Sequence, residues 1–243
     1  MEPVQRGRVR LEPTAKRVRA YLNGRPVADT VRALMVWESP HYPTYYIPLE
    51  DLEEGLLEPD GETRHSPSRG EGAVHSVDGK KGAALVYAES PIERLRDRVR
   101  LDWDAMDAWF EEDVEVFVHA RDPYTRVDVL ESSRHVRVEV GGVTVADSHH
   151  PKILFETGLP ARYYLPKTDI RLDLLEPTDT VTRCPYKGWA EYWSVAGEKD
   201  LAWSYRTPLR ESGEVAGLVS FYNEKVDIYL DGVLQERPKT PFS

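Results

Sequence analysis

The chain contains 243 residues, of which 40% are hydrophobic and 30% are charged, as is usual for a globular protein. No apolar run approaches the roughly 20 residues of a membrane span, and the charged N-terminus lacks the apolar segment of a secretory signal. The formal net charge of −10 argues against a nucleic-acid partner, because nucleic-acid binders concentrate lysine and arginine on one face. We therefore expect a cytoplasmic protein whose partner is neither a membrane nor a nucleic acid.

Two hairpins in the sequence reveal an internal repeat. Residues 18–29 alternate as two strands around Asn23-Gly24, the strongest short-range hairpin signal, and residues 136–147 repeat this pattern around Gly141-Gly142. The shift from residue 18 to residue 136 is 118 positions, and it holds at many later landmarks. These include Tyr45-Tyr46 with Tyr163-Tyr164, Pro48 with Pro166, Leu57-Glu58-Pro59 with Leu175-Glu176-Pro177, and Gly70 with Gly188.

A period above 100 residues indicates duplication of a whole domain, because solenoid units are far shorter. We divide the chain into a tail (1–14), a first repeat domain (15–120), a linker (121–133), a second repeat domain (134–233) and a C-terminal tail (234–243). Near the ends we align Val114–Val118 with Val226–Leu230, which requires an insertion around Asp104–Phe110 in the first copy.

The pattern within each copy predicts a mainly β fold, with a curled antiparallel sheet or sandwich and a few short helices. A one-turn helix opened by proline is expected after the Tyr-Tyr strand. Ser90-Pro91 and Thr207-Pro208 indicate the start of a second short helix in each copy, and residues 104–109 a third in the first copy only.

The segment Cys184–Trp193 places a thiol, an amine, two phenols and two indoles within ten positions. The first copy keeps its proline and glycine frame at residues 66–75 but replaces the rings and the thiol. A shared core would keep its bulk, since deleting a large buried side chain costs on the order of 3–5 kcal/mol. The segment therefore predicts a small-molecule pocket present only in the second copy, although packing residues of the core remain an alternative.

Aromatic rings can hold a planar or cationic ligand by stacking and cation–π attraction. Strand alternation places Trp189, Glu191 and Trp193 on one face, with Ala190 and Tyr192 on the other. The predicted ligand-binding residues are Glu156, Tyr164, Tyr186, Trp189, Tyr192, Trp193, Trp203, Tyr205 and Tyr222.

Cys184 and Lys187 are candidate catalytic residues, because a neighbouring ammonium favours the reactive thiolate and a desolvated lysine can form a Schiff base. His149 or His150 is a possible base. The alternatives are a buried, inert cysteine and a surface lysine paired with Glu191.

A single cysteine excludes an internal disulfide and a zinc site built from several thiolates. None of the seven histidines has the His-x-x-x-His or Glu-x-x-His spacing of a metal motif with a convincing carboxylate. We therefore predict no metal site and no cofactor.

The segment Cys184–Trp193, the motif Trp203-Ser204-Tyr205 before Pro208, and residues 220–227 resemble the family called domain of unknown function 427. The resemblance covers about residues 134–233, and the first copy matches its frame. It implies a β-rich fold like the β-tent group, some members of which hold small cyclic or cationic ligands in an aromatic cage.

The family is also labelled nucleotidyltransferase-like. Such enzymes need a Gly-Ser turn followed by paired acidic residues, and the nearest candidate here, Asp102-Trp103-Asp104, lacks the Gly-Ser turn. Three functions stay open: a small-molecule binding protein, an enzyme (thiol-dependent or nucleotidyltransferase-like) using Cys184 and Lys187, and a protein-interaction module.

Overall fold

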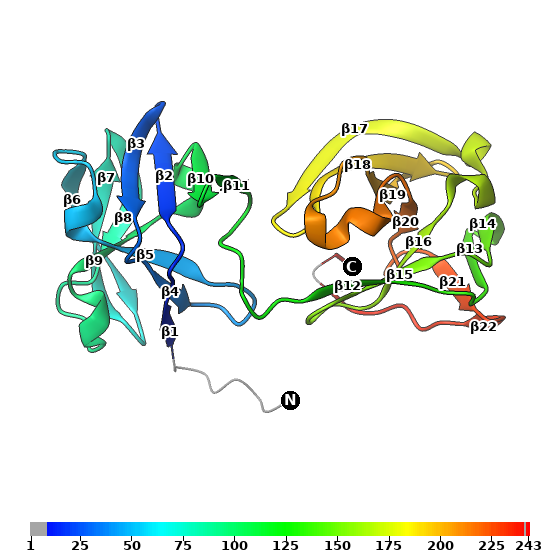
Figure 1. The fold of residues 1–243 in the computed structure, drawn as a ribbon, viewed down its shortest axis with the longest axis horizontal. Helices are drawn as coiled ribbons and strands as arrows, with labels where there is room; N and C mark the ends of the chain where they lie inside the picture. The colour runs from blue at the N-terminus through cyan, green and yellow to red at the C-terminus, as the bar shows by residue number, and fades with distance from the viewer. Residues whose placement is uncertain (1–8, 241) are drawn as a thin grey trace. The chain divides into compact units, whose positions relative to one another are not determined.

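The computed structural model describes residues 9–240 and 242–243. The chain divides into two compact units, Met1–Asp122 and Pro123–Ser243. Each contains a seven-stranded and a four-stranded antiparallel sheet (Figure 1), which confirms the predicted mainly β class. No helix in the described part of the chain is long and apolar enough to cross a membrane.

The elements of the first unit are β1 (Arg10–Pro13), β2 (Val18–Leu22), β3 (Arg25–Thr30), β4 (Leu34–Trp37), β5 (Thr44–Pro48), η1 (Leu49–Asp51), β6 (Leu57–Ser66), β7 (Gly70–Val77), β8 (Lys80–Val86), η2 (Glu93–Leu95), β9 (Arg98–Leu101), η3 (Trp103–Ala105), β10 (Ala108–Glu111) and β11 (Val114–Val116). Its sheets have the orders β1-β4-β5-β9-β8-β7-β6 and β11-β10-β2-β3.

The elements of the second unit are β12 (Val127–Glu131), β13 (Val136–Val140), β14 (Val143–Ser148), β15 (Lys152–Glu156), β16 (Arg162–Leu165), η4 (Lys167–Asp169), η5 (Leu172–Leu174), β17 (Leu175–Cys184), β18 (Gly188–Val195), β19 (Glu198–Tyr205), η6 (Arg210–Val215), β20 (Val219–Phe221), β21 (Asp227–Leu230) and β22 (Val233–Leu234). Its sheets have the orders β12-β15-β16-β20-β19-β18-β17 and β14-β13-β21-β22.

Strands extend into segments that the sequence analysis assigned to tails and to the linker. β1 lies in the predicted N-terminal tail, whose residues 1–8 are outside the described residues. The segment predicted as a linker contains β12, an edge strand of the second unit, and β22 begins at the end of the second predicted domain and continues into the C-terminal tail. β1 and β12 gain their hydrogen bonds from partners distant in sequence, β4 and β15, whereas β22 forms a hairpin with the preceding β21.

The two predicted hairpins are present and share one irregularity. Asn23 and Gly24 have φ values of 52° and 71°, the left-handed conformation that a tight hairpin turn requires. In both hairpins the register then shifts at a β-bulge, between Ala20 and Tyr21 in the first and between Val138 and Glu139 in the second. The bulge is therefore a duplicated feature of the fold.

The predicted alignment of the C-terminal strands was wrong. β10 is the neighbour of β2, and β21 is the neighbour of β13, so β10 and β21 are equivalent and β11 corresponds to β22. Residues 102–107 connect β9 to β10, whereas residues 222–226 connect β20 to β21, so the predicted insertion shrinks to a single residue. Alternating Val-x-Val strands look alike in sequence, and only their pairing distinguishes them.

The predicted short helices are 3-10 turns. Pro48 and Pro166 precede η1 and η4 as expected. The second helices begin at Glu93 and Arg210, slightly after the predicted starts. The helix predicted over residues 104–109 is η3 followed by the first residues of β10.

Each unit buries one apolar cluster between its sheets and a second on the outer face of the seven-stranded sheet. In the second unit, Val138 and Ile228 of the small sheet meet Leu165 and Phe221 of the large sheet in the main core. The outer cluster contains Leu154, Tyr164, Ala190, Tyr192, Trp203, Tyr205 and Val215. This outer face carries most of the predicted site residues.

Candidate functional site

Aromatic side chains line up across four neighbouring strands, β16, β20, β19 and β18, on the outer face of the second unit's large sheet. Tyr164 pairs with Ser220, Ser220 with Trp203, and Trp203 with Tyr192, and directly opposed residues project to the same face. Tyr164, Trp203 and Tyr192 are all buried, with 0%, 6% and 7% of their surface exposed. We call this set, with Tyr205 and Tyr222, the aromatic face.

Specific contacts hold the rings of the aromatic face together. The indole Nε1 of Trp203 donates to the Tyr164 hydroxyl at 3.2 Å, and the two rings meet edge to face. The ring centroid of Tyr222 lies 4.6 Å from that of Trp203. The Tyr192 hydroxyl lies 3.3 Å from the Tyr222 hydroxyl and 2.8 Å from Thr182 Oγ1, which continues the polar chain toward the solvent-exposed edge.

The hydroxyl of Ser220 is an exception in this network. Ser220 is fully buried between Tyr164 and Trp203, and its Oγ has no hydrogen-bond partner among the described residues. Buried polar atoms without a partner are uncommon in folded proteins, and each calls for a ligand, a water or a structural reason.

Burial suppresses ionisation of the phenols. Burial is the largest cause raising the pKa of Tyr164, Tyr205 and Tyr222 above the ordinary tyrosine value. Smaller contributions come from the carboxylate of Glu156 and the thiol of Cys184 at Tyr164 and Tyr205. The phenols therefore act as neutral hydrogen-bonding groups at physiological pH.

Lys187 and Glu156 form a buried ion pair at the margin of the aromatic face. Lys187 lies in the turn between β17 and β18, its ammonium bonds to Glu156 Oε2, and both side chains are about nine-tenths buried. The alternative pairing with Glu191 does not occur, because Glu191 accepts instead from Arg206. Cys184, which is half-buried, ends β17 opposite Gly188.

A second buried ion pair, which the sequence analysis missed, borders the other end of the face. Arg162 donates to both carboxylate oxygens of Glu224 at 2.6 Å, and the two side chains are 8% and 0% exposed. The Arg162 guanidinium also lies 5.6 Å and 5.9 Å from the ring centroids of Trp203 and Tyr222. The local signal was weak, because the partners are 62 positions apart.

The family comparison places both units in one family. The model of the family described as Domain of unknown function (DUF427) matches residues 10–112 and 128–232, one match in each unit. The chain belongs to the DUF427 family. No match was found among the curated proteins.

The predicted indoles of the second DUF427 copy do not all share one face. Trp193 packs against the main core on the opposite side of β18 from Tyr192. Trp189 is 47% exposed, and the Arg183 guanidinium lies 3.8 Å from its ring centroid. The buried Tyr186 lies in the turn that also holds Lys187. Of the predicted set, Trp189 and Trp193 therefore stand apart from the aromatic face.

The first DUF427 copy keeps the carboxylate and two of the rings, Tyr46 and Tyr87, at the positions of Tyr164 and Tyr205, but not the others. Glu38, equivalent to Glu156, accepts from Arg69 and Arg100 at 2.5 and 3.2 Å, and from the Tyr46 hydroxyl at 2.6 Å. A cavity of about 440 Å³ opens beside these residues. It is lined by Glu38, Thr44, Arg69, Arg100 and Trp103, among others.

The second copy fills the equivalent space differently. Arg162 stands at the position of Thr44, and Ser220 at the position of Arg100. Residues near the C-terminus add further cover, since Thr240 Oγ1 donates to Glu224 and the Phe242 ring centroid lies 6.3 Å from that of Tyr222. A cavity of about 160 Å³ in this unit is lined by Ala161, Tyr163, Asn223 and Pro238, among others, and includes none of the predicted site residues.

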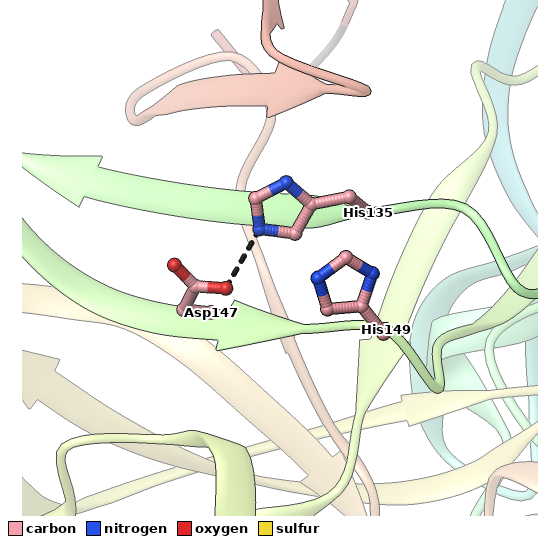
Figure 2. Close-up of side chains that lie close together, drawn as sticks. All are labelled: His135, Asp147 and His149. Atoms are coloured by element: carbon pink, nitrogen blue, oxygen red, sulfur yellow. Dashed lines mark hydrogen bonds and ion pairs between the residues drawn. The ribbon is translucent and has the colours of Figure 1, made fainter.

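A separate cluster could hold a metal ion. Figure 2 shows His135, Asp147 and His149 at the open end of the β13–β14 hairpin, with the His135 Nε2 atom 2.7 Å from Asp147 Oδ1. The two imidazole rings stack with their centroids 4.3 Å apart. One potential ligand atom from each residue lies within 4.8 Å of the other two. The sequence analysis did not find this cluster.

Proposed function

We propose that the second DUF427 copy is a binding domain for a small planar molecule that stacks on the aromatic face beside Tyr222. The observation that carries the proposal is the row of rings on one sheet face, next to a buried serine hydroxyl without a partner. A stacked ring contributes about 0.5–1.5 kcal/mol beyond its buried area, so three such contacts would add at most about 4.5 kcal/mol to the gain from burying the apolar surface of the ligand.

The edge of the face at Tyr222 is the expected entrance. Tyr222 is only partly buried, and its outer neighbour Phe242 is 44% exposed. In the first copy, the corresponding region borders a cavity of about 440 Å³, within the range of small-molecule sites. Displacement of Phe242 and Thr240 would open an equivalent space in the second copy.

A planar ligand fits this face better than a cationic one. The cation–π position over Trp203 and Tyr222 is already taken by the Arg162 guanidinium, which Glu224 neutralises. A cationic ligand would have to displace or approach this arginine, at an electrostatic cost. A planar group can instead stack on Tyr222 in the place that Phe242 covers.

Cys184 and Lys187 then serve the site as polar groups at its margin. Schiff-base chemistry would first require breaking the buried pair of Lys187 with Glu156. His149, one possible base for the thiol, stacks on His135 at the end of a strand of the other sheet. These contacts favour binding over thiol-dependent catalysis.

The test is a fluorescence titration of the full chain against a panel of planar metabolites, with mass spectrometry of the ligand to detect turnover. We expect saturable quenching without product, weakened in Tyr222→Ala and strengthened in Phe242→Ala, which removes cover. Trp189→Ala is the matched control, because it deletes an indole outside the aromatic face. Equal binding by Tyr222→Ala and the wild-type protein would place the site elsewhere, and product formation would favour the enzyme alternative.

A further inference from the structure

The hairpin of β13 and β14 brings three potential metal ligands together through its register. Arg137 pairs with Asp147 and Val136 with Ser148, so the next pair outward is His135 with His149. In an antiparallel pair, residues directly opposite and those two positions along the strand share one face. His135, His149 and Asp147 therefore project from the same side of the hairpin, as Figure 2 shows.

The distances suit a single ion with little rearrangement. Zinc bonds to imidazole nitrogen and carboxylate oxygen at about 2.0–2.2 Å, so two ligands of one ion lie roughly 3–4 Å apart. One potential ligand atom of each residue is already within 4.8 Å of the others. Asp147 and His149 are exposed, so their side chains can rotate to close the remaining gap.

Neighbouring charges hold the first ligand in place. The backbone N–H of His135 donates to Asp231 Oδ1 at 3.0 Å, and Asp231 is in turn bound by Arg134 Nε at 2.7 Å. These contacts hold the backbone at His135, from which the imidazole projects. The second hairpin of the small sheet, β21–β22, therefore anchors the residue that leads into β13.

The first copy provides an internal comparison at the same three positions. Arg17, Asp29 and Val31 replace His135, Asp147 and His149, at the shift of 118 that relates the copies. The Arg17 guanidinium pairs with Asp29, with Nε to Oδ1 at 2.7 Å. The carboxylate is thus retained in both copies, but its partner is a permanent cation in the first and the imidazole of His135 in the second.

From this arrangement we infer that His135, Asp147 and His149 form a binding site for one divalent transition-metal ion of the zinc type. Two imidazoles and one carboxylate are the ligands that Zn²⁺ and its neighbours favour, whereas Mg²⁺ and Ca²⁺ prefer oxygen alone. Three protein ligands leave at least one coordination position for water or another ligand. The site is separate from the aromatic face, since its ligands flank strands of the other sheet.

The experiment is a calorimetric titration of the untagged full chain with Zn²⁺, checked against Mg²⁺. We expect about one Zn²⁺ per chain, with no binding of Mg²⁺ at the same concentrations. The variant His135→Arg/His149→Val installs the residues of the first copy in an identical hairpin, so it is expected to fold. It should weaken binding at least about tenfold, in keeping with the sensitivity of metal sites to their surroundings.

His150→Ala is the matched control, because His150 is exposed next to the cluster and is not part of it. It should bind Zn²⁺ like the wild-type protein. Nuclear magnetic resonance of the imidazole protons gives a second readout, and the signals of His135 and His149 should shift on Zn²⁺ addition while that of His150 stays unchanged. Unaltered stoichiometry and affinity in the double variant, or a stronger effect of His150→Ala, would overturn the inference.

Discussion

Replacing Arg162 by methionine is the sharpest test of the packing around the aromatic face. The change keeps most of the side-chain volume but leaves Glu224, 0% exposed, without its guanidinium partner. Removing one member of a buried ion pair costs about 3–5 kcal/mol. Because the Thr240 hydroxyl still donates to Glu224 at 2.6 Å, we expect a loss near the lower end, about 3 kcal/mol.

The assay is urea unfolding, with peptide-resolved hydrogen exchange to assign the transition to the second unit. Arg206→Met is the matched control, since Arg206 is 81% exposed in its pair with Glu191 and should contribute less than about 1 kcal/mol. The double variant Arg162→Met/Glu224→Gln should recover part of the loss, because no charge remains buried. Equal stability of Arg162→Met and the wild-type protein would refute the view that this pair supports the face.

The same pair predicts a pH dependence. Burial raises the pKa of Glu224, but hydrogen bonds from Arg162 and Thr240 outweigh it, and the net shift is downward. A carboxylate with a lowered pKa in the folded state stabilises the fold above its unfolded pKa, and this contribution disappears as the pH falls through the folded value. In urea unfolding at a series of pH values, the wild-type protein should therefore keep this contribution in full near pH 7 and lose it as the pH falls below about 4.3.

Three further outcomes are expected. Gly72→Ala should lower the unfolding free energy of the first unit by about 1–3 kcal/mol, because the new Cβ would lie 2.7 Å from the ring of Tyr87, while Gly213→Ala meets no atom within 4 Å and should be nearly neutral in urea unfolding. Iodoacetamide should alkylate the half-buried Cys184 more slowly in the native than in the urea-unfolded protein, and faster native labelling would indicate an activated thiolate. Trp203→Leu installs the residue that the first copy has at this position. It should lower the unfolding free energy of the second unit by less than a Trp-to-Ala truncation, which costs about 3–5 kcal/mol, and a larger loss would show that this position does not tolerate the smaller side chain.

The comparison of the two copies located the positions at which side-chain volume differs. The sequence could not show how the surrounding structure adapts to that difference. Tyr192 and Trp203 are buried in the outer cluster, whereas the first copy has the smaller Val74 and Leu85 there. In the first copy, cavities open on this side of the sheet, one of them lined by Val74, while the Val74 and Leu85 side chains themselves stay buried.

Alternation along β18 was predicted correctly, yet the function of each ring depends on the layer that covers it. Trp193 and Tyr192 project to opposite faces, as the period of two requires. Both faces are covered near this point, one by the small sheet and the other by η6, where Val215 joins the outer cluster. Only tertiary packing decides which face is the core and which carries the candidate site.

The sequence by itself determined the duplication, the mainly β class, the hairpins and the identity of the chemically rich segment, because these depend on local patterns and on similarity between the copies. Tertiary structure decided the long-range pairs, such as Arg162 with Glu224, and the register of the β13–β14 hairpin. Without the bulge after Val138, the turn would place His135 opposite Ser148, and Asp147 and His149 would face the other side. A shift of one residue inverts every side chain beyond it, so the metal-ligand cluster exists only through that irregularity.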